Sequence, residues 1–195
     1  MKIIRLAKDK PEDWDKMLDW FEKRTKKHIE RVQKYCKKIE DYDKDRFGGL
    51  VDRGEVHDQS KYESPERDSY VYITWKHKCE DDGVDFEPPE DIDDKMDKAT
   101  HHHVKHNKHH PEASCDKEVN LINREDRDKP PEEMIDATKM TDLDIAEMAA
   151  DWMAMSEEKG GKPQDWADKN VNVRWKFTDE QKDLIYELLN EIFDG

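Results

Sequence analysis

The sequence predicts an all-α fold, and three of its features support that prediction. Apolar residues recur three and four positions apart over long segments, as they do on one face of an α-helix. Two segments begin with a threonine followed three residues later by Asp or Gln, a pairing typical of helix starts. No segment alternates apolar and polar residues over a length that would build a sheet, although residues 171–175 fit one short strand.

Length and composition predict a single domain over residues 1–195, with a core over about residues 11–158 and a final helix over about residues 178–193. At 195 residues the chain has the usual size of one domain. Only 33% of the residues are apolar and 44% are charged, a balance that by itself favours disorder. Six Trp, six Tyr and five Phe counter this, because aromatic side chains bury the most area each.

The first helix is predicted to start near Pro11, which fits a first helical turn. Its inward stripe places His28 among apolar side chains, so the imidazole should point toward the core. Lys26, Lys27 and Arg31 fall on the opposite face and should stay in water. The stripe consists of Trp14, Leu18, Phe21, Thr25, His28, Val32, Tyr35 and Ile39.

Two helical segments are predicted between the first helix and an acidic loop. Glycines within residues 48–54 should break the chain before residues 55–61, a short helix or turn. The next helix should begin with Ser64 as N-cap and Pro65 at the first helical position. Residues 80–91 are acidic, contain two prolines and are expected to form a loop. The helix that begins at Pro65 and precedes this loop should bury Val71, Ile73 and Trp75.

A further helix is predicted over residues 92–110, and its inward stripe ends in histidines. Six of the nine histidines of the chain lie within residues 101–110. Residues 111–131 show no periodicity and should form a long loop with at most one turn; such loops are often functional. The stripe consists of Ile92, Met96, Ala99, His103, His106 and His110.

Two helices complete the predicted fold. One begins with a capping box at Thr141–Asp144 and runs through Met155, with Asp151 inside its apolar surface. Residues 160–161, both glycine, should end it. The last helix begins with a second box at Thr178–Gln181 and should bury Leu184, Ile185, Leu188, Leu189 and Ile192.

The charge balance argues against several classes of partner. The chain has 35 Lys and Arg against 50 Asp and Glu, a net charge of −15 that disfavours general DNA binding and anionic membranes. Residues 22–38 hold eight basic and two acidic residues, whereas residues 80–98 hold ten acidic and two basic ones. The basic segment can attract a small anion such as phosphate, or it is simply a solvated helix face.

The cysteines and the hydropathy pattern favour a cytoplasmic protein. The three cysteines, Cys36, Cys79 and Cys115, are odd in number and form no CxxC, so neither a disulfide framework nor a zinc ribbon is indicated. No run of apolar residues is long enough for a secretory signal or a membrane span. The sequence leaves the oligomeric state open.

Imidazole and carboxylate groups together favour a site for first-row transition metals. Histidines three or four residues apart lie on one helix face and can share an ion, although a histidine-rich tract alone equally fits an exposed helix. His28 and Asp151 are inward on separate helices, and His57 and Asp58 are an adjacent pair. One bound cation would compensate these buried carboxylates together.

The order of these residues resembles the HD-domain superfamily of metal-dependent phosphohydrolases, an all-helical fold named for its His-Asp pair. The resemblance covers roughly residues 20–158 and implies an HD-like helical bundle. It reaches Lys61, because that superfamily often has a lysine three residues after the Asp. The chain also looks like an uncharacterised HD-like family of bacterial and phage proteins. The motifs that match are His57-Asp58-x-Ser-Lys61, His102-His103 followed by Asn107-x-His109-His110-Pro111-Glu112, and Glu147-Met-x-x-Asp151-Trp152.

The resemblance implies that one or two divalent ions of Mn, Fe, Ni, Co or Zn are bound. The first ion would be held by His28, His57, Asp58 and Asp151. Asp58 would then bridge to a second ion. That ion would be held by His103 and by His109 or His110.

The ligands of the second ion are less sharply defined. The helix stripe favours His103, His106 and His110, whereas the family-like pattern favours His102, His103, His109 and His110. His103 and His110 appear in both sets and are the first-choice ligands. His102, His106 and His109 are therefore second-choice ligands, and His101 is left outside the site.

The ligands imply hydrolysis of a small phosphate ester, such as a nucleotide, by metal-activated hydroxide. A divalent ion lowers the pKa of bound water toward neutrality and polarises the phosphoryl oxygen. Lys61 would neutralise phosphate charge, and Glu112 would move a proton or support a ligand. The alternative for Lys61 is a surface lysine, and for Glu112 a loop or helix-end carboxylate.

Two other functions remain open. A di-iron oxygenase on the same fold would use the extra histidine ligands. An acidic interaction protein, such as a phage-type inhibitor that imitates nucleic acid, would use the charge of −15 and need no metal.

Overall fold

The structure, a computed structural model, describes residues 11, 13–89, 92–116 and 133–193. These residues are mostly helical, which confirms the predicted all-α class. Their strands are two residues long each: β1 (Ile135–Asp136) pairs in parallel with β2 (Trp175–Lys176). Of the expected strand over residues 171–175, Trp175 lies in β2 and forms an isolated bridge with Val171, and the residues between them form a turn. None of the helices in the described ranges combines the length and the apolar character that crossing a bilayer requires.

Helix α1 (Trp14–Tyr42) is the longest element and packs chiefly against α7, α3 and α4. Its N-cap is Asp13, so Pro11 precedes the helix instead of lying in its first turn. The predicted inward stripe is buried apart from Leu18, which is half-buried because Met17 takes the inner position. His28 lies within this buried stripe, as predicted.

The chain then reverses through α2 (Lys44–Phe47) and α3 (Leu50–Val56). Gly49 has a positive φ of 92° and separates the two helices. Gly54 lies inside α3, so the prediction that it breaks the chain is wrong. A Cβ atom at Gly54 would lie 3.2 Å from Sγ of Cys36. This glycine therefore permits the close approach of α3 to α1.

The 3-10 helix η1 (Gln59–Tyr62) leads into α4 (Arg67–Asp82). The predicted helix start is wrong, because Glu66 and not Ser64 is the residue before α4. Residues 80–82 of the expected acidic loop lie in the last turn of α4, and Gly83, with φ of 68°, ends it. Residues 90–91 of that loop lie outside the described residues.

Helix α5 (Asp93–His106) ends four residues earlier than predicted and is followed by the short α6 (Pro111–Ser114). Asn107 ends α5 in an extended conformation, and its side-chain amide donates to the carbonyl of His103 at 2.8 Å. Pro111 disfavours helical geometry at the preceding residue, His110, which is also extended. Residues 117–132 of the expected long loop lie outside the described residues.

The carboxyl-terminal half contains α7 (Asp142–Lys159), α8 (Pro163–Asn170) and α9 (Asp179–Ile192). Both predicted capping boxes are confirmed, at Thr141 with Asp144 and at Thr178 with Gln181. The five predicted core residues of α9 are buried. Gly160 follows α7, which extends to Lys159 and not only to Met155.

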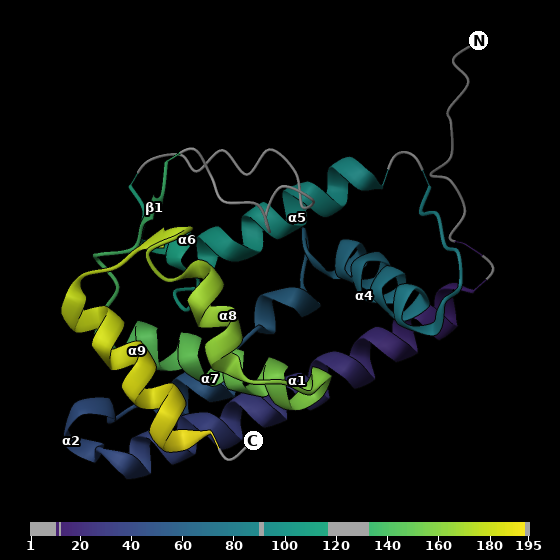
Figure 1. Ribbon diagram of the computed structural model, residues 1–195. Coiled ribbons are helices and arrows are strands. Elements are labelled where there is room, and N and C mark those ends of the chain that lie inside the picture. Colours follow the sequence, from purple (N-terminus) through teal and green to yellow (C-terminus); the bar gives the residue numbers. More distant parts are fainter. Residues whose placement is uncertain (1–10, 12, 90–91, 117–132, 194–195) are drawn as a thin grey trace.

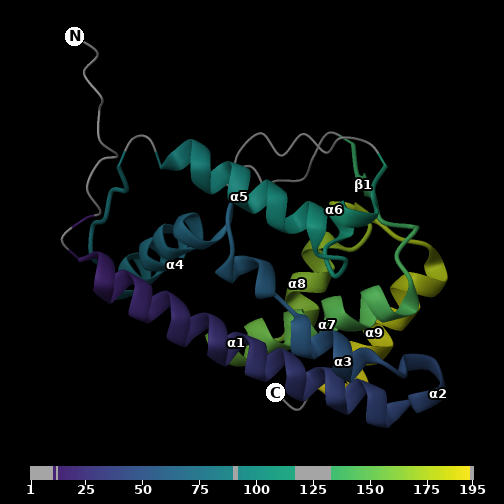
Figure 2. The same ribbon diagram turned by 180° about the vertical axis from the view of Figure 1, so that it is seen from behind.

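The buried apolar residues form two clusters, and α1 belongs to both. The larger joins the second half of α1 to α2, α3 and α7–α9; the smaller joins the first half to α4 and α5. Figures 1 and 2 show α5 running along the side of the molecule opposite α1, with α4 between them. His28 lies between Phe21 of the smaller cluster and Val32 of the larger one. The junction of the clusters is therefore polar.

Candidate metal centre

The predicted metal ligands come from several parts of the chain and meet at one buried carboxylate, that of Asp58. His28 lies midway along α1, and Asp151 lies on α7. His57 and Asp58 directly follow α3. The remaining ligands lie in the last turn of α5 and in the connection to α6, and they are His103, His109 and His110.

The first ligand group consists of His28, His57 and Asp151, around Oδ2 of Asp58. The Nε2 atoms of His28 and His57 each lie 3.6 Å from this oxygen. His28 Nε2 is also 3.0 Å from Oδ1 of Asp151. Both imidazoles are buried, whereas the Asp151 side chain is 18% exposed. This group therefore meets solvent at Asp151.

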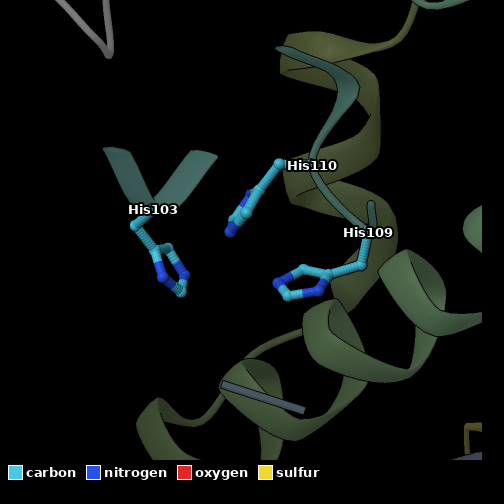
Figure 3. Close-up of side chains that lie close together, drawn as sticks. All are labelled: His103, His109 and His110. Carbon is cyan, nitrogen blue, oxygen red and sulfur yellow. The ribbon is translucent and has the colours of Figure 1, made fainter. Parts of the chain in front are cut away.

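The second ligand group consists of His103, His109 and His110, on the side of the other Asp58 oxygen. Oδ1 lies 3.2 Å from Nε2 of His103 and 3.7 Å from Nε2 of His109. One nitrogen of each of the three imidazoles lies within 4.8 Å of the others. Figure 3 shows the three rings pointing toward one another, His103 from α5 and the other two from the following turn. Asp58 thus offers one oxygen to each group.

The backbone of Asp58 is in the left-handed region, with φ of 58° and ψ of 12°. Aspartate is one of the few residues that adopt this conformation at low cost, and such residues are concentrated at functional sites. The carboxyl group is buried, which opposes ionisation. Lys61, His57 and His103 outweigh that effect and hold the pKa of Asp58 well below its usual range.

Two buried glutamates orient three of the imidazoles from the side away from Asp58. Oε1 of Glu147 accepts from Nδ1 of His57 at 2.8 Å and lies 3.2 Å from Nδ1 of His109. Oε2 of Glu66 accepts from Nδ1 of His103 at 2.9 Å. A carboxylate only accepts, so these Nδ1 atoms carry the proton, and in the neutral rings the Nε2 lone pairs face Asp58. Metal-ligating histidines are oriented in this way.

Arg53 fixes the position of Glu147. Its Nε donates to Oε2 of Glu147 at 2.8 Å, and its Nη2 donates to Oδ1 of Asp144 at 2.7 Å. Burial of Glu147 opposes its charge, but the bonds from His109 and His57 dominate and lower the pKa of this carboxyl. The pKa of Asp151 is lowered in the same way, because the contact with His28 outweighs the effect of burial. The centre therefore keeps its carboxylates ionised.

Within the described residues, Nδ1 of His28, Nε2 of His57 and Oδ1 of Asp58 are buried polar atoms of the centre that have no hydrogen-bond partner. Such atoms are rare in folded proteins, and each costs free energy unless something binds it. Nε2 of His57 and the Asp58 carboxylate both present lone pairs, and a cation between them would satisfy both. The donor set of imidazoles and carboxylates suits a first-row divalent metal ion.

The comparisons with known proteins identify a family but no activity. The model of the "Family of unknown function (DUF5662)" matches residues 17–193. The chain belongs to this family. The matched range includes both ligand groups and both orienting glutamates. No curated protein and no solved structure matches the chain.

In this DUF5662 protein, Lys61 lies at the centre and not on the open surface. Its Nζ donates to Oδ2 of Asp58 at 2.5 Å, and its side chain is 17% exposed. The ammonium also lies 5.1 Å from the centre of the Tyr70 ring. Lys61 is thus placed between the buried carboxylate and solvent, where a charged ligand can reach it.

Glu112, predicted to move a proton or support a ligand, lies outside both ligand groups. This residue is fully buried on α6. Its Oε1 accepts from Nε1 of Trp175 at 3.1 Å and lies 3.6 Å from Nη2 of Arg174. Glu112 therefore ties α6, and with it the preceding His109–His110 turn, to the chain around β2.

Two of the second-choice histidine ligands also lie outside the groups around Asp58. His106 is exposed, and its Nδ1 donates to the carbonyl of His102 at 2.7 Å. Nδ1 of His102 pairs with Oε1 of Glu66 at 2.7 Å. His109, the third of them, is 3% exposed and belongs to the second group. The prediction that His106 lies on the inward stripe of this helix is wrong, because its side chain is exposed whereas that of His103 is buried.

The basic segment of α1 is partly neutralised by α7 in this DUF5662 protein. Arg24 pairs with Glu158 at 2.9 Å, and Lys34 pairs with Glu157 at 2.5 Å. Arg31 lies near both glutamates. These ion pairs favour the interpretation of the basic segment as a solvated helix face over its interpretation as an anion-binding segment.

Sequence reasoning missed the roles of Glu66, Glu147 and Arg53. The sequence could have indicated the role of Glu147, because this residue lies one helical turn before Asp151 and therefore on the same helix face. Glu66 gave no such signal, since it lies next to Pro65 in an irregular segment. Arg53 resembled any solvated arginine of a short helix.

Proposed function

We propose that this protein is a metal-dependent phosphohydrolase that acts on a small phosphate ester, such as a nucleotide. The observation that supports the proposal best is the position of Asp58. One oxygen faces His28 and His57, the other faces His103, and Lys61 reaches the same carboxylate. This arrangement suits two divalent ions that share one bridging carboxylate.

The bound ions would supply a hydroxide nucleophile near neutral pH and polarise the phosphoryl oxygen. The protein's own part is to fix the ligands and to exclude water. Glu147 and Glu66 orient the imidazoles, and the buried position of His57 and His103 keeps bulk solvent away. Asp151, the most exposed ligand of the first group, marks the side from which a substrate would approach.

Lys61 is the residue that we propose to bind the substrate phosphate. Its ammonium must give up Oδ2 of Asp58 where that oxygen binds an ion. The flexible side chain of lysine can then turn its charge toward a phosphate oxygen. The residue would act in both the ground state and the transition state, because negative charge persists on the phosphoryl group in both.

The test compares the metal-loaded wild-type protein with Asp58→Asn and Lys61→Met. Each is assayed on p-nitrophenyl phosphate and on nucleoside mono-, tri- and cyclic phosphates, with Mn²⁺, Co²⁺, Ni²⁺ and Zn²⁺ in turn. We expect Asp58→Asn to lose metal and activity together, and Lys61→Met to keep its metal but lose at least tenfold in kcat/KM. A fully loaded wild-type protein that hydrolyses none of these esters would overturn the proposal.

The second candidate is a di-iron oxygenase, favoured by the three imidazoles of the second ligand group. Nitrogen-rich sites suit iron as well as zinc and nickel. Elemental analysis after anaerobic purification distinguishes the two candidates. Iron with an oxygen-dependent change in the absorption spectrum would favour the oxygenase, and a colourless protein with another metal would favour the hydrolase.

A further inference from the structure

The outer face of α5 carries a pair of histidines that the buried centre does not use. His102 and His106 are one helical turn apart, and their rings stack with centroids 4.0 Å apart and planes 18° apart. The His102 side chain is 32% exposed, and His106 is exposed. Solvent therefore reaches both rings.

Hydrogen bonds fix the tautomer of both imidazoles. Nδ1 of His106 contacts the carbonyl oxygen of His102 at 2.7 Å, and a carbonyl can only accept, so this nitrogen carries the proton. Nδ1 of His102 faces Oε1 of Glu66 at 2.7 Å, and a carboxylate likewise only accepts. In the neutral rings the lone pair is therefore on Nε2 in both cases. Two parallel rings thus present two unprotonated nitrogens on the solvent side.

We propose that His102 and His106 form an additional, exchangeable binding site for a first-row divalent metal ion. Histidines at positions i and i+4 of a helix share one face, which lets them bind one ion. Imidazole is a preferred ligand of Zn²⁺, Ni²⁺ and Cu²⁺. Water would complete the coordination, so the ion would be held more weakly than one enclosed by the buried ligand groups.

Glu66 connects this outer pair to the buried centre. Its Oε1 pairs with His102 and its Oε2 pairs with His103, a member of the second ligand group. A histidine that pairs with a carboxylate is oriented by it and becomes a stronger metal ligand. The outer ion would therefore lie one carboxylate away from the second group and share its orienting residue.

The test is a titration with Ni²⁺ and Zn²⁺ of protein whose buried centre has first been loaded and then desalted. It compares the wild type with His106→Ala and His106→Gln. The control is His77→Ala, because His77 is also exposed and its Nδ1 also pairs with a carboxylate, that of Glu80 at 3.0 Å. Elemental analysis of the desalted samples gives the ions retained, and calorimetry gives those taken up afterwards.

We expect wild type and His77→Ala to take up one further ion per chain, which a second desalting step removes. Both His106 variants should bind that ion at least tenfold more weakly and keep the retained ions unchanged. The proposal would be overturned by equal uptake in the wild type and the His106 variants, or by no further uptake in the wild type. It would also be overturned if His106→Gln lost a retained ion, because His106 would then belong to the centre. The result does not depend on the proposed phosphohydrolase activity.

Discussion

The two ligand groups that share Asp58 differ in how the fold holds them. The first group lies on the long helices α1 and α7 and at the end of α3, where the large apolar cluster packs these elements together. The second lies on the last turn of α5 and on a short turn before α6. Long packed helices fix the ligands of the first group, whereas contacts of single side chains fix those of the second.

This difference illustrates two ways to build a candidate metal ligand set. Helix packing places His28 opposite Asp151 without any help from neighbouring polar residues. The second group instead depends on specific contacts: Glu66 orients His103, Glu147 contacts His109, and Glu112 anchors the turn through Trp175. In the first group the orienting contact is that of His57 with Glu147. This group should therefore tolerate changes in its other polar neighbours better than the second.

The largest effect is expected from Asp58→Asn, because its two carboxylate oxygens face the two groups. The amide keeps the shape of the side chain but removes its charge, and the protein should lose both ions, with affinity reduced by more than about 100-fold. Elemental analysis and metal titration measure this. Asp52→Asn, an exposed residue of α3, is the matched control and should leave metal content unchanged.

Single-ligand variants should separate the groups. Asp151→Asn should reduce metal content by the first ion, and His109→Ala by the second, each leaving the other ion bound. Elemental analysis after desalting gives the ions per chain. Loss of both ions from either variant would show that the groups do not bind independently and would contradict the comparison.

Substitution of the orienting glutamates should have smaller effects on metal affinity, and the two substitutions should differ in the number of ligand groups that they affect. Glu147→Gln should weaken binding to both groups by about 10–100-fold, since Glu147 contacts His57 and His109. Glu66→Gln should weaken only the second group by a similar factor, because Glu66 contacts His103. Titration of each variant with Zn²⁺ checks this, and an equal effect of Glu66→Gln on both ions would contradict it.

The pH dependence of binding should also distinguish the groups. Burial opposes the charge on His57. The negative charges of Asp58 and Glu147 outweigh this effect and raise the pKa of His57 above its ordinary value near 6.5. Burial and the charge of His57 lower the pKa of His109. Protons compete with metal below each pKa, so His57 is protonated first as the pH falls.

The first ion should therefore be released at a higher pH than the second. Affinity for it should fall about tenfold per pH unit for each proton taken up. Titrations between pH 8 and pH 5.5 on Asp151→Asn and His109→Ala would follow the ions separately. The opposite order of release would contradict the assignment of the two pKa shifts.

The smallest effect is expected from Thr178→Ala, which removes the cap of α9 far from both groups. Loss of the bond from Gln181 N to the threonine hydroxyl should lower the free energy of unfolding by about 1 kcal/mol. Metal content should not change. Urea denaturation followed by circular dichroism measures the stability, and elemental analysis provides the control.

Much of the fold and the first ligand group could be predicted from the sequence. The apolar spacing of α1 and the capping boxes of α7 and α9 are local signals. They can be read from neighbouring residues because they do not depend on tertiary contacts. His28 and Asp151 inherit their positions from these helices. The motif His57-Asp58 adds the rest of this group.

The second group was predicted less well because its geometry depends on tertiary contacts. The bonds that Asn107 donates to Ser60 and to the carbonyl of His103 mark the end of α5, and no glycine marks it. Pro111 was the one available signal, since it disfavours a helical His110. A helical period that continues past this point groups His106 with His103, although the side chain of His106 is exposed.

The bond between Glu112 and Trp175 has a consequence for biosynthesis. The ribosome makes the chain from its amino end, so α1, η1 and α5 emerge well before β2 does. Until Trp175 is available, nothing in the described structure supplies the indole donor that anchors Glu112. We therefore expect the second ligand group to be completed only once β2 has emerged, which is later than the part of α7 that carries Asp151. A nascent chain would acquire its two metal-binding halves in sequence, with the half that depends on the carboxyl-terminal segment finished last.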